Sequence, residues 1–280
     1  MKRLIWVASL VALLASCGDR GGEISSAPAT DETGSAVAAQ PRAQIPRAII
    51  FGNPDRTLAR ISPDGTHVSW LAPNNGVLNV WVAPVDDTDS AKVITHDDYR
   101  GINNYSWAGN SEYVYYSQDD GGDENFHVYS ANITSGEVID LTPIKEGARA
   151  QIEAQSASHP DHLVIGTNER NPQVFDPFMV NGKTGESDLI RENPGFISFL
   201  FDNNLEPRLG LMPTPDGGGN LVDLDGNVIA EIPTADFLST GAIGFNAAND
   251  VVFMIDTRGR DKAALTALSL DSGETTVIAE

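Results

Sequence analysis

The chain has 280 residues, of which 41% are hydrophobic and 20% charged, a composition that suits one large folded domain or two ordinary ones. Its 39 acidic and 18 basic residues give a formal net charge of −21. A field of this sign repels phosphate backbones, so the composition argues against nucleic-acid binding.

The first 17 residues have the pattern of a bacterial lipoprotein signal. A basic start and an apolar run, too short for a dependable membrane span, precede the sole cysteine, Cys17. Leu14-Ala15-Ser16-Cys17 resembles a lipobox, in which the cysteine is lipidated, and Gly18 in place of Asp fits outer-membrane sorting. We therefore expect a signal peptide over 1–17 and a lipidated Cys17. The protein would be exported and anchored to the bacterial membrane facing the periplasm, with the outer membrane favoured. The alternative is a cleaved signal with a chance cysteine.

Residues 18–44 are rich in Gly, Ser, Ala, Thr and Pro and contain no aromatic residue. Such a segment buries too little apolar surface to offset its ordering entropy. We predict a disordered linker over this segment and a folded domain over 45–280.

From residue 57 onward, short apolar runs such as "HVSWLA", "EYVYYS" and "DVVFMID" alternate with turn residues. Each run has the length and the β-branched or aromatic content of a strand. No stretch of a dozen residues past the leader has a convincing helical period. The pattern predicts an all-β fold.

Two series of turns repeat along this region. Gly136, Gly185, Gly226 and Gly273 recur at gaps of 49, 41 and 47 residues, with Ser90 one unit earlier. A second series keeps gaps of 46, 50, 45 and 43 residues, at Gly65, Ser111, Asp161, Glu206 and Asn249. A period of about 46 residues is typical of a β-propeller blade of four antiparallel strands. We expect five four-stranded blades, at about 57–97, 101–144, 148–191, 195–237 and 240–280.

The stretch "IPRAIIFGNPDRTLARISPDGTHVSWLAP" (Ile45 to Pro73) and the later "GGDEN" (121–125) carry a family likeness. Together they resemble the propeller of bacterial prolyl oligopeptidase family serine peptidases. In that family an N-terminal propeller, usually of seven blades, covers an α/β-hydrolase domain with a Ser-Asp-His triad. The resemblance implies the N-terminal, substrate-gating portion of an exported peptidase that acts on peptides, incomplete in blade number. It implies no metal and no organic cofactor.

The residues of the triad have no counterpart in this sequence. The nearest approach to a nucleophile elbow, Gly109-Asn110-Ser111-Glu112-Tyr113, lacks the second glycine and lies in a predicted turn. None of the histidines has a matching context, and the sequence contains no stretch typical of an α/β-hydrolase domain. We therefore predict no catalytic residue and no activity for this chain alone. The histidines are His67, His96, His127, His159 and His162.

The stretch "SQDDGGDENFHVYS" (Ser117 to Ser130) gathers four carboxylates around two glycines. An EF-type calcium loop starting at Asp119 would need Gly at position six and a carboxylate at position twelve, and neither is present. The simplest interpretation is a wide hairpin loop between the second and third strands of blade two. By resemblance, some family members hold a substrate's positive N-terminus with acidic propeller residues. The candidates here are Asp123, Glu124 and Asn125.

A rival hypothesis comes from a different class of protein. A free-standing periplasmic propeller lipoprotein that binds a protein partner, similar to the propeller of the Tol-Pal system, shares the Ser-Pro-Asp-Gly turns and the all-β composition. It would need a ring that closes on itself. The partners considered are thus a peptide substrate, a protein, and the membrane through Cys17. Neither hypothesis assigns an oligomeric state.

Overall fold

The computed structural model describes residues 44–280, so the predicted signal, Cys17 and nearly all of the linker lie outside the described residues. The chain divides into two units, of which the first ends at Gly52 and the second is Asn53–Glu280. The described part of the first unit contains the five-residue helix α1 (Arg47–Phe51), which the all-β prediction lacked. No helix among residues 44–280 is long and apolar enough to cross a membrane.

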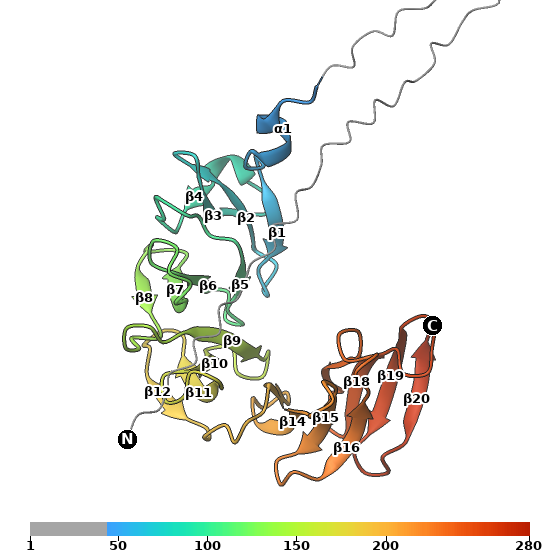
Figure 1. Cartoon of the computed structure of the whole chain (residues 1–280). Coiled ribbons are helices and arrows are strands. Elements are labelled where there is room, and N and C mark those ends of the chain that lie inside the picture. The colour runs from blue at the N-terminus through green and yellow to red at the C-terminus, as the bar shows by residue number, and fades with distance from the viewer. Residues whose placement is uncertain (1–43) are drawn as a thin grey trace, which may run out of the picture. The chain divides into compact units, whose positions relative to one another are not determined.

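The second unit consists of five four-stranded antiparallel sheets, each built from strands that follow one another in the chain (Figure 1). This architecture confirms the predicted all-β propeller fold. Each sheet lies inside one of the five expected ranges. The first sheet is β1 (Thr57–Ile61), β2 (His67–Asn74), β3 (Val77–Pro84) and β4 (Lys92–Val93), and the second is β5 (Tyr105–Trp107), β6 (Tyr113–Gln118), β7 (His127–Asn132) and β8 (Val138–Asp140). The third is β9 (Ala150–Gln155), β10 (His162–Thr167), β11 (Asp176–Asn181) and β12 (Ser187–Leu189). The fourth is β13 (Ser198–Phe201), β14 (Pro207–Pro213), β15 (Gly219–Asp223) and β16 (Val228–Ile232), and the fifth is β17 (Gly241–Phe245), β18 (Val251–Asp256), β19 (Ala264–Ser269) and β20 (Thr275–Ala279).

The turn between the third and fourth strands uses the predicted glycine in four of the five sheets. These glycines have φ of 71, 75, 90 and 72°, a left-handed conformation that costs glycine little. The first sheet departs from the prediction, because Ser90 ends a short 3₁₀ helix, Thr88–Ser90, and has no positive φ. The four glycines are Gly136, Gly185, Gly226 and Gly273.

The turn between the first and second strands also follows the repeat, with two corrections. Positive φ occurs at Gly65, Ser111 and Asn249, as the spacing predicts. In the fourth sheet it falls on Leu205, one residue before Glu206, and in the third sheet Asp161 has no positive φ. The repeat therefore locates these turns to within a residue, while their backbone conformations vary.

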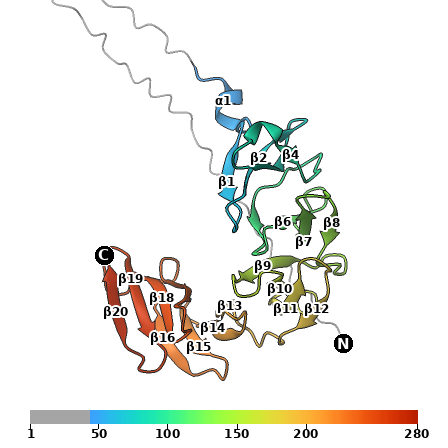
Figure 2. The ribbon, with the colours of Figure 1, turned by 180° about the vertical axis from the view of Figure 1, so that it is seen from behind.

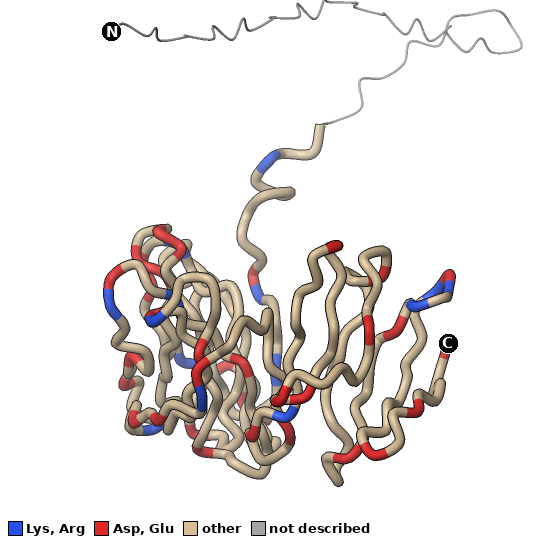
Figure 3. Tube along the Cα trace, turned by 60° about the horizontal axis from the view of Figure 1, so that its bottom comes forward, with Lys and Arg blue, Asp and Glu red and all other residues tan. Residues whose placement is uncertain are grey.

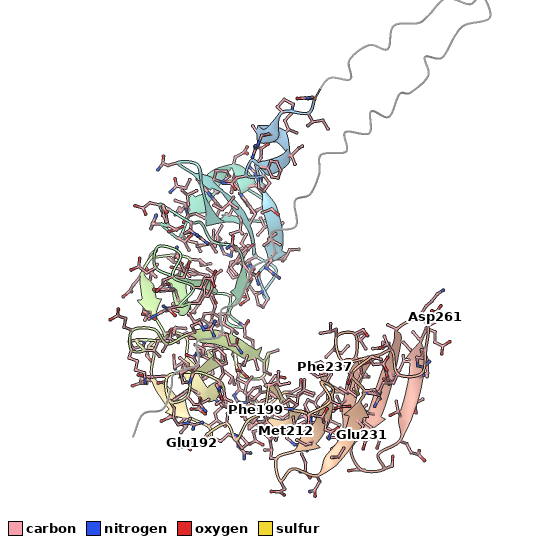
Figure 4. All side chains as sticks on the ribbon, in the orientation of Figure 1. Glu192, Phe199, Met212, Glu231, Phe237 and Asp261 are labelled. Atoms are coloured by element: carbon pink, nitrogen blue, oxygen red, sulfur yellow. The ribbon has the colours of Figure 1, made fainter. Side chains whose placement is uncertain are left out.

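Consecutive sheets pack face to face through apolar side chains. Each of four hydrophobic clusters joins one sheet to the next in the chain. Tyr115 and Leu163 are fully buried between the second and third sheets, and Val164 packs with Phe199 between the third and fourth. Figure 4 labels Phe199 and Met212, which belong to this last cluster. Burial of this kind supplies most of the stability of stacked sheets, since one sheet alone leaves two apolar faces in water.

Strand order fixes which loops share a face of the unit. The first strand forms one edge of each sheet, and Figures 1 and 2 show β1 and β9 on the inner side of the curve along which the sheets follow one another. Because strands alternate in direction, the loop between the second and third strands emerges beside the connections that link consecutive sheets. The β6–β7 loop and the connections on either side of the second sheet therefore lie on the same face.

Candidate functional site

The acidic stretch forms the loop between β6 and β7, where the sequence predicted a wide hairpin. Gly121 and Gly122 have φ of 62 and 93°, and Glu124 also has a positive φ of 61°. A side chain at Gly122 would in addition meet the guanidinium group of Arg100. The two glycines therefore let the loop turn sharply beside the connection that enters the second sheet.

This loop borders a cavity of about 660 Å³, which we call the acidic cavity. Three separate segments line it: the connection Asp97–Arg100, the loop with the start of β7, and the connection at Glu146 and Gly147. Carboxylates outnumber basic groups in the lining, and Figure 3 shows the same excess of Asp and Glu along the whole unit. The lining acids are Asp97, Asp98, Asp119, Asp120, Asp123 and Glu146, and the basic groups are Arg100 and His127.

Asp123 is held in one orientation by Asn125. The backbone N–H of Asn125 donates to Asp123 Oδ1 at 3.0 Å, and its side-chain amide donates to Oδ2 at 2.8 Å. These two donors hold the pKa of Asp123 below its usual range, so the group remains a carboxylate at neutral pH. Both residues line the acidic cavity.

Glu124 occupies a different position from the other two candidates. Its backbone N–H donates to Asp119 Oδ2 at 3.0 Å, which ties the middle of the loop to its beginning. The side chain is exposed and does not line the acidic cavity. The structure therefore brings together two of the three predicted site residues and leaves Glu124 beside them.

An aromatic stack forms another wall of the acidic cavity. His127 and Tyr129 are stacked with centroids 6.3 Å apart, and Tyr129 stacks on Tyr116 at 5.3 Å. His127 Nδ1 lies 2.9 Å from Asp140 Oδ2. Sequence reasoning missed His127 and Tyr129 as site residues, although their spacing of two on a strand places them on one face.

Within residues 44–280 no serine hydroxyl is hydrogen-bonded to a histidine ring, although the Thr66 hydroxyl lies 2.7 Å from His67 Nδ1. No group of three or more His, Cys, Asp or Glu side chains within residues 44–280 is arranged to hold a metal ion. Ser111 lies in the turn between β5 and β6, and its hydroxyl accepts the backbone N–H of Asp64 at 3.1 Å. That contact makes Ser111 a residue that joins the first two sheets. The carboxylates that line the acidic cavity suit it to binding a cationic group.

No protein-family model matches the chain. A curated relative, dipeptidyl aminopeptidase BIII of Pseudoxanthomonas mexicana, is 36% identical over 241 residues, which are 84% of this chain and 35% of that protein. The chain therefore spans about a third of that relative's length. Two solved structures share the fold, with TM-scores of 0.52 and 0.50 and identities of 17% and 19%. They are dipeptidyl peptidase 4 of Porphyromonas gingivalis (80% of this chain, 39% of that one) and the β-propeller domain of the trilobed protease of Pyrococcus furiosus (81% and 71%).

Proposed function

The chain belongs to the prolyl oligopeptidase family of peptidases, and on that basis we propose that it is the propeller portion that admits peptides and positions them for cleavage. The observation that carries the proposal is the sequence likeness to a dipeptidyl aminopeptidase over most of this chain. That relative's name describes removal of dipeptides from an amino terminus. A propeller serving such an enzyme needs a group that recognises the free amino end.

The acidic cavity supplies groups suited to that recognition. A peptide's amino terminus is an ammonium ion, which donates charge-assisted hydrogen bonds to carboxylates. Asp123 is already oriented by Asn125, so binding requires little further ordering of this side chain. The surrounding acids from the two connections add attraction at longer range, which raises the local concentration of cations. We assign Asp123 to the ammonium group and Asn125 to its support, with Glu124 at the rim.

We assign peptide-bond hydrolysis to a hydrolase domain of a longer protein. Within residues 44–280 no serine hydroxyl is hydrogen-bonded to a histidine ring, and His127 is paired with Asp140. A serine without an adjacent base is a weak nucleophile at neutral pH. The described propeller alone is therefore expected to bind peptides and hydrolyse none. We further propose that Cys17 is lipidated and that the protein faces the periplasm from the outer membrane.

The test compares peptides with and without a charged amino terminus. We would measure, by calorimetry, binding of tetra-alanine and of N-acetyl-tetra-alanine to the purified chain. The free peptide should bind more tightly, and Asp123→Asn should weaken it by about two- to fivefold, as expected for an exposed ion pair, without affecting the acetylated form. Asp188→Asn, an exposed carboxylate on β12 outside the acidic cavity, is the matched control and should change neither value.

Varying the ionic strength tests the same interaction in a second way. Added salt should reduce the preference for the free peptide because exposed charges are screened. Equal affinities for both peptides would contradict the assignment of the acidic cavity. If neither peptide binds, the result would instead favour the rival hypothesis, a propeller that binds a protein partner.

A further inference from the structure

Arg60 of β1 is the one charged side chain that lines a cavity of about 540 Å³ on the inner side of the first three sheets. The lining comes from β1, from β5 and β6 with Phe126, and from β9. The first strands β1, β5 and β9 border the inner side of the curve (Figure 1). No carboxylate belongs to this lining, although the chain has a net charge of −21. We call this space the Arg60 cavity.

Two neighbours hold the Arg60 side chain against the second sheet. Its Nη2 donates to Asn104 Oδ1 at 3.2 Å. Its guanidinium lies over the ring of Tyr105, 5.5 Å from the centroid, where the electron-rich face of the ring attracts a cation. That ring is itself fixed, because Tyr105 is 3% exposed and its hydroxyl donates to the backbone carbonyl of Leu58 at 2.8 Å. The guanidinium is therefore oriented before a ligand binds.

Most of the donors of Arg60 are unused. A guanidinium carries five N–H donors, and among the described groups one of them is engaged, by Asn104. Arg60 forms no ion pair within residues 44–280, whereas Arg170, Arg208 and Arg258 each contact an aspartate. Arg60 is exposed, so a ligand in the cavity has access to it. The cavity therefore presents a cation without a protein counter-charge.

The lining adds neutral donors to this cation. Asn104 uses its side-chain oxygen for Arg60 and for the backbone N–H of Tyr105, at 3.0 Å, which leaves its amide N–H groups to donate elsewhere. The hydroxyl of Ser106 on β5 is buried and has no hydrogen-bond partner among the described groups. A buried polar group without a partner is costly unless water or a ligand satisfies it. Asn104 and Ser106 both line the cavity.

A carboxylate matches these groups better than a phosphate. The planar guanidinium binds a carboxylate through two parallel N–H···O bonds. One cation balances the single charge of a carboxylate, whereas a phosphate group carries about −1.5 to −2 at neutral pH and would remain partly unpaired in this acidic protein. Tyr116 and Phe126 give the lining aromatic surface, which suits the apolar part of an organic acid.

We propose that Arg60 binds a carboxylate group of a ligand, with Asn104 as a neutral donor beside it. The peptide identity of that ligand rests on the proposed function, and its carboxylate is that of a carboxyl terminus or of an Asp or Glu side chain. Glu153 on β9 lies outside the lining and accepts the Gln151 amide at 3.2 Å, so repulsion by its charge favours the β1 end for an anion. The site is separate from the acidic cavity, because the two linings share no residue.

The first experiment measures, by calorimetry, the binding of three N-acetylated peptides to the purified chain. They are N-acetyl-tetra-alanine with a free carboxyl terminus, its C-terminal amide, and N-acetyl-Ala-Ala-Glu-Ala amide. At least one of the two carboxylate peptides should bind more tightly than the uncharged amide. A preference for the free acid identifies a carboxyl terminus, and a preference for the Glu peptide identifies a side chain. Acetylation removes the amino terminus, so the acidic cavity does not contribute to these differences.

Variants of Arg60 assign the preference to one residue. Arg60→Gln should weaken the preferred carboxylate peptide by about fivefold and leave the uncharged amide unchanged, as expected for an exposed ion pair. Arg60→Lys keeps the charge without the planar fork and should restore part of the affinity. Arg260→Gln removes the same charge from the segment between β18 and β19 of the fifth sheet and is the matched control. An equal loss in Arg60→Gln and Arg260→Gln would contradict the assignment.

A second measurement does not depend on peptide binding. In nitrogen-detected NMR of the purified chain, butyrate should shift the Arg60 Nε resonance, and inorganic phosphate at the same concentration should shift it less. If butyrate leaves the resonance unchanged and all three peptides bind equally, the inference is wrong even where the free-amine preference at Asp123 persists. A larger shift with phosphate would overturn the choice of a carboxylate. If butyrate shifts the resonance while no peptide binds, the carboxylate site stands and the proposed function fails.

Discussion

Arg258 is the side chain whose removal should most weaken the junction between the fourth and fifth sheets. Its Nε and Nη2 donate to Asp256 Oδ1 at 2.9 Å and Oδ2 at 2.7 Å, a bidentate pair. Its Nη1 donates to the backbone carbonyl of Glu231 at 2.9 Å. Glu231, labelled in Figure 4, lies on β16 of the neighbouring sheet. Asp256 is 4% exposed, so its charge has almost no access to water.

The loss in the free energy of unfolding follows from the groups that remain after Arg258→Gln. Breaking a buried ion pair by removing one partner costs about 3–5 kcal/mol, since the remaining charge is desolvated and unpaired. Asp256 keeps one donor, the backbone N–H of residue 258 at 3.0 Å, and the Arg258 side chain is 22% exposed. Both facts reduce the cost, and we expect a loss of about 2–4 kcal/mol in the free energy of unfolding.

The loss should depend on pH in a defined direction. The Arg258 guanidinium holds the pKa of Asp256 below its usual range, against the opposing effect of burial. A carboxyl whose pKa is depressed by folding adds stability above its unfolded pKa of about 3.9, and this contribution disappears as pH falls through the folded value. The difference in the free energy of unfolding between the unmodified chain and Arg258→Gln should therefore be largest at neutral pH and shrink below about pH 4.

Urea unfolding at several pH values measures this difference. Arg260→Gln is the matched control, two residues away, because Arg260 pairs with Glu280, whose side chain is 70% exposed. Such a surface pair contributes about 0–1 kcal/mol. The reasoning fails if Arg258→Gln costs no more than Arg260→Gln, or if its cost is the same at pH 3 as at pH 7.

Two further predictions concern the core and the native protein. Tyr115 is 1% exposed, and its hydroxyl has no hydrogen-bond partner among the described groups. Tyr115→Phe should therefore leave the free energy of unfolding unchanged or raise it by about 1 kcal/mol, and a clear loss of stability in urea unfolding would contradict this. An antibody against residues 45–280 should detect, in the membrane fraction of the source cells, a band of more than twice the 29.9 kDa of this chain. A single band near 29.9 kDa would oppose the peptidase proposal and favour a propeller that binds a protein partner.

The candidate site was accessible from the sequence only where its parts are close in the chain. The β6–β7 loop was found because Asp119 to Asn125 form one uninterrupted polar segment with glycines. The acids of the two connections, Asp97 and Glu146, join it through the pairing of β6 with β7 and the packing of neighbouring sheets. Neither the charge pattern nor the spacing of these acids along the chain indicates that they lie beside the loop.

The amino-acid sequence alone determined the all-β propeller fold and the positions of its sheets, since alternation and left-handed turns such as those at Gly136 and Gly185 are local properties of the backbone. The family also followed from the sequence, through the likeness of its motifs. Tertiary structure alone decided which carboxylates lie free and which are paired. Asp256 is paired with Arg258, whereas Glu153, which the register between β9 and β10 skips, forms no ion pair within residues 44–280. Those differences arise from register and packing between strands, where a shift of one residue moves a side chain to the other face of its sheet.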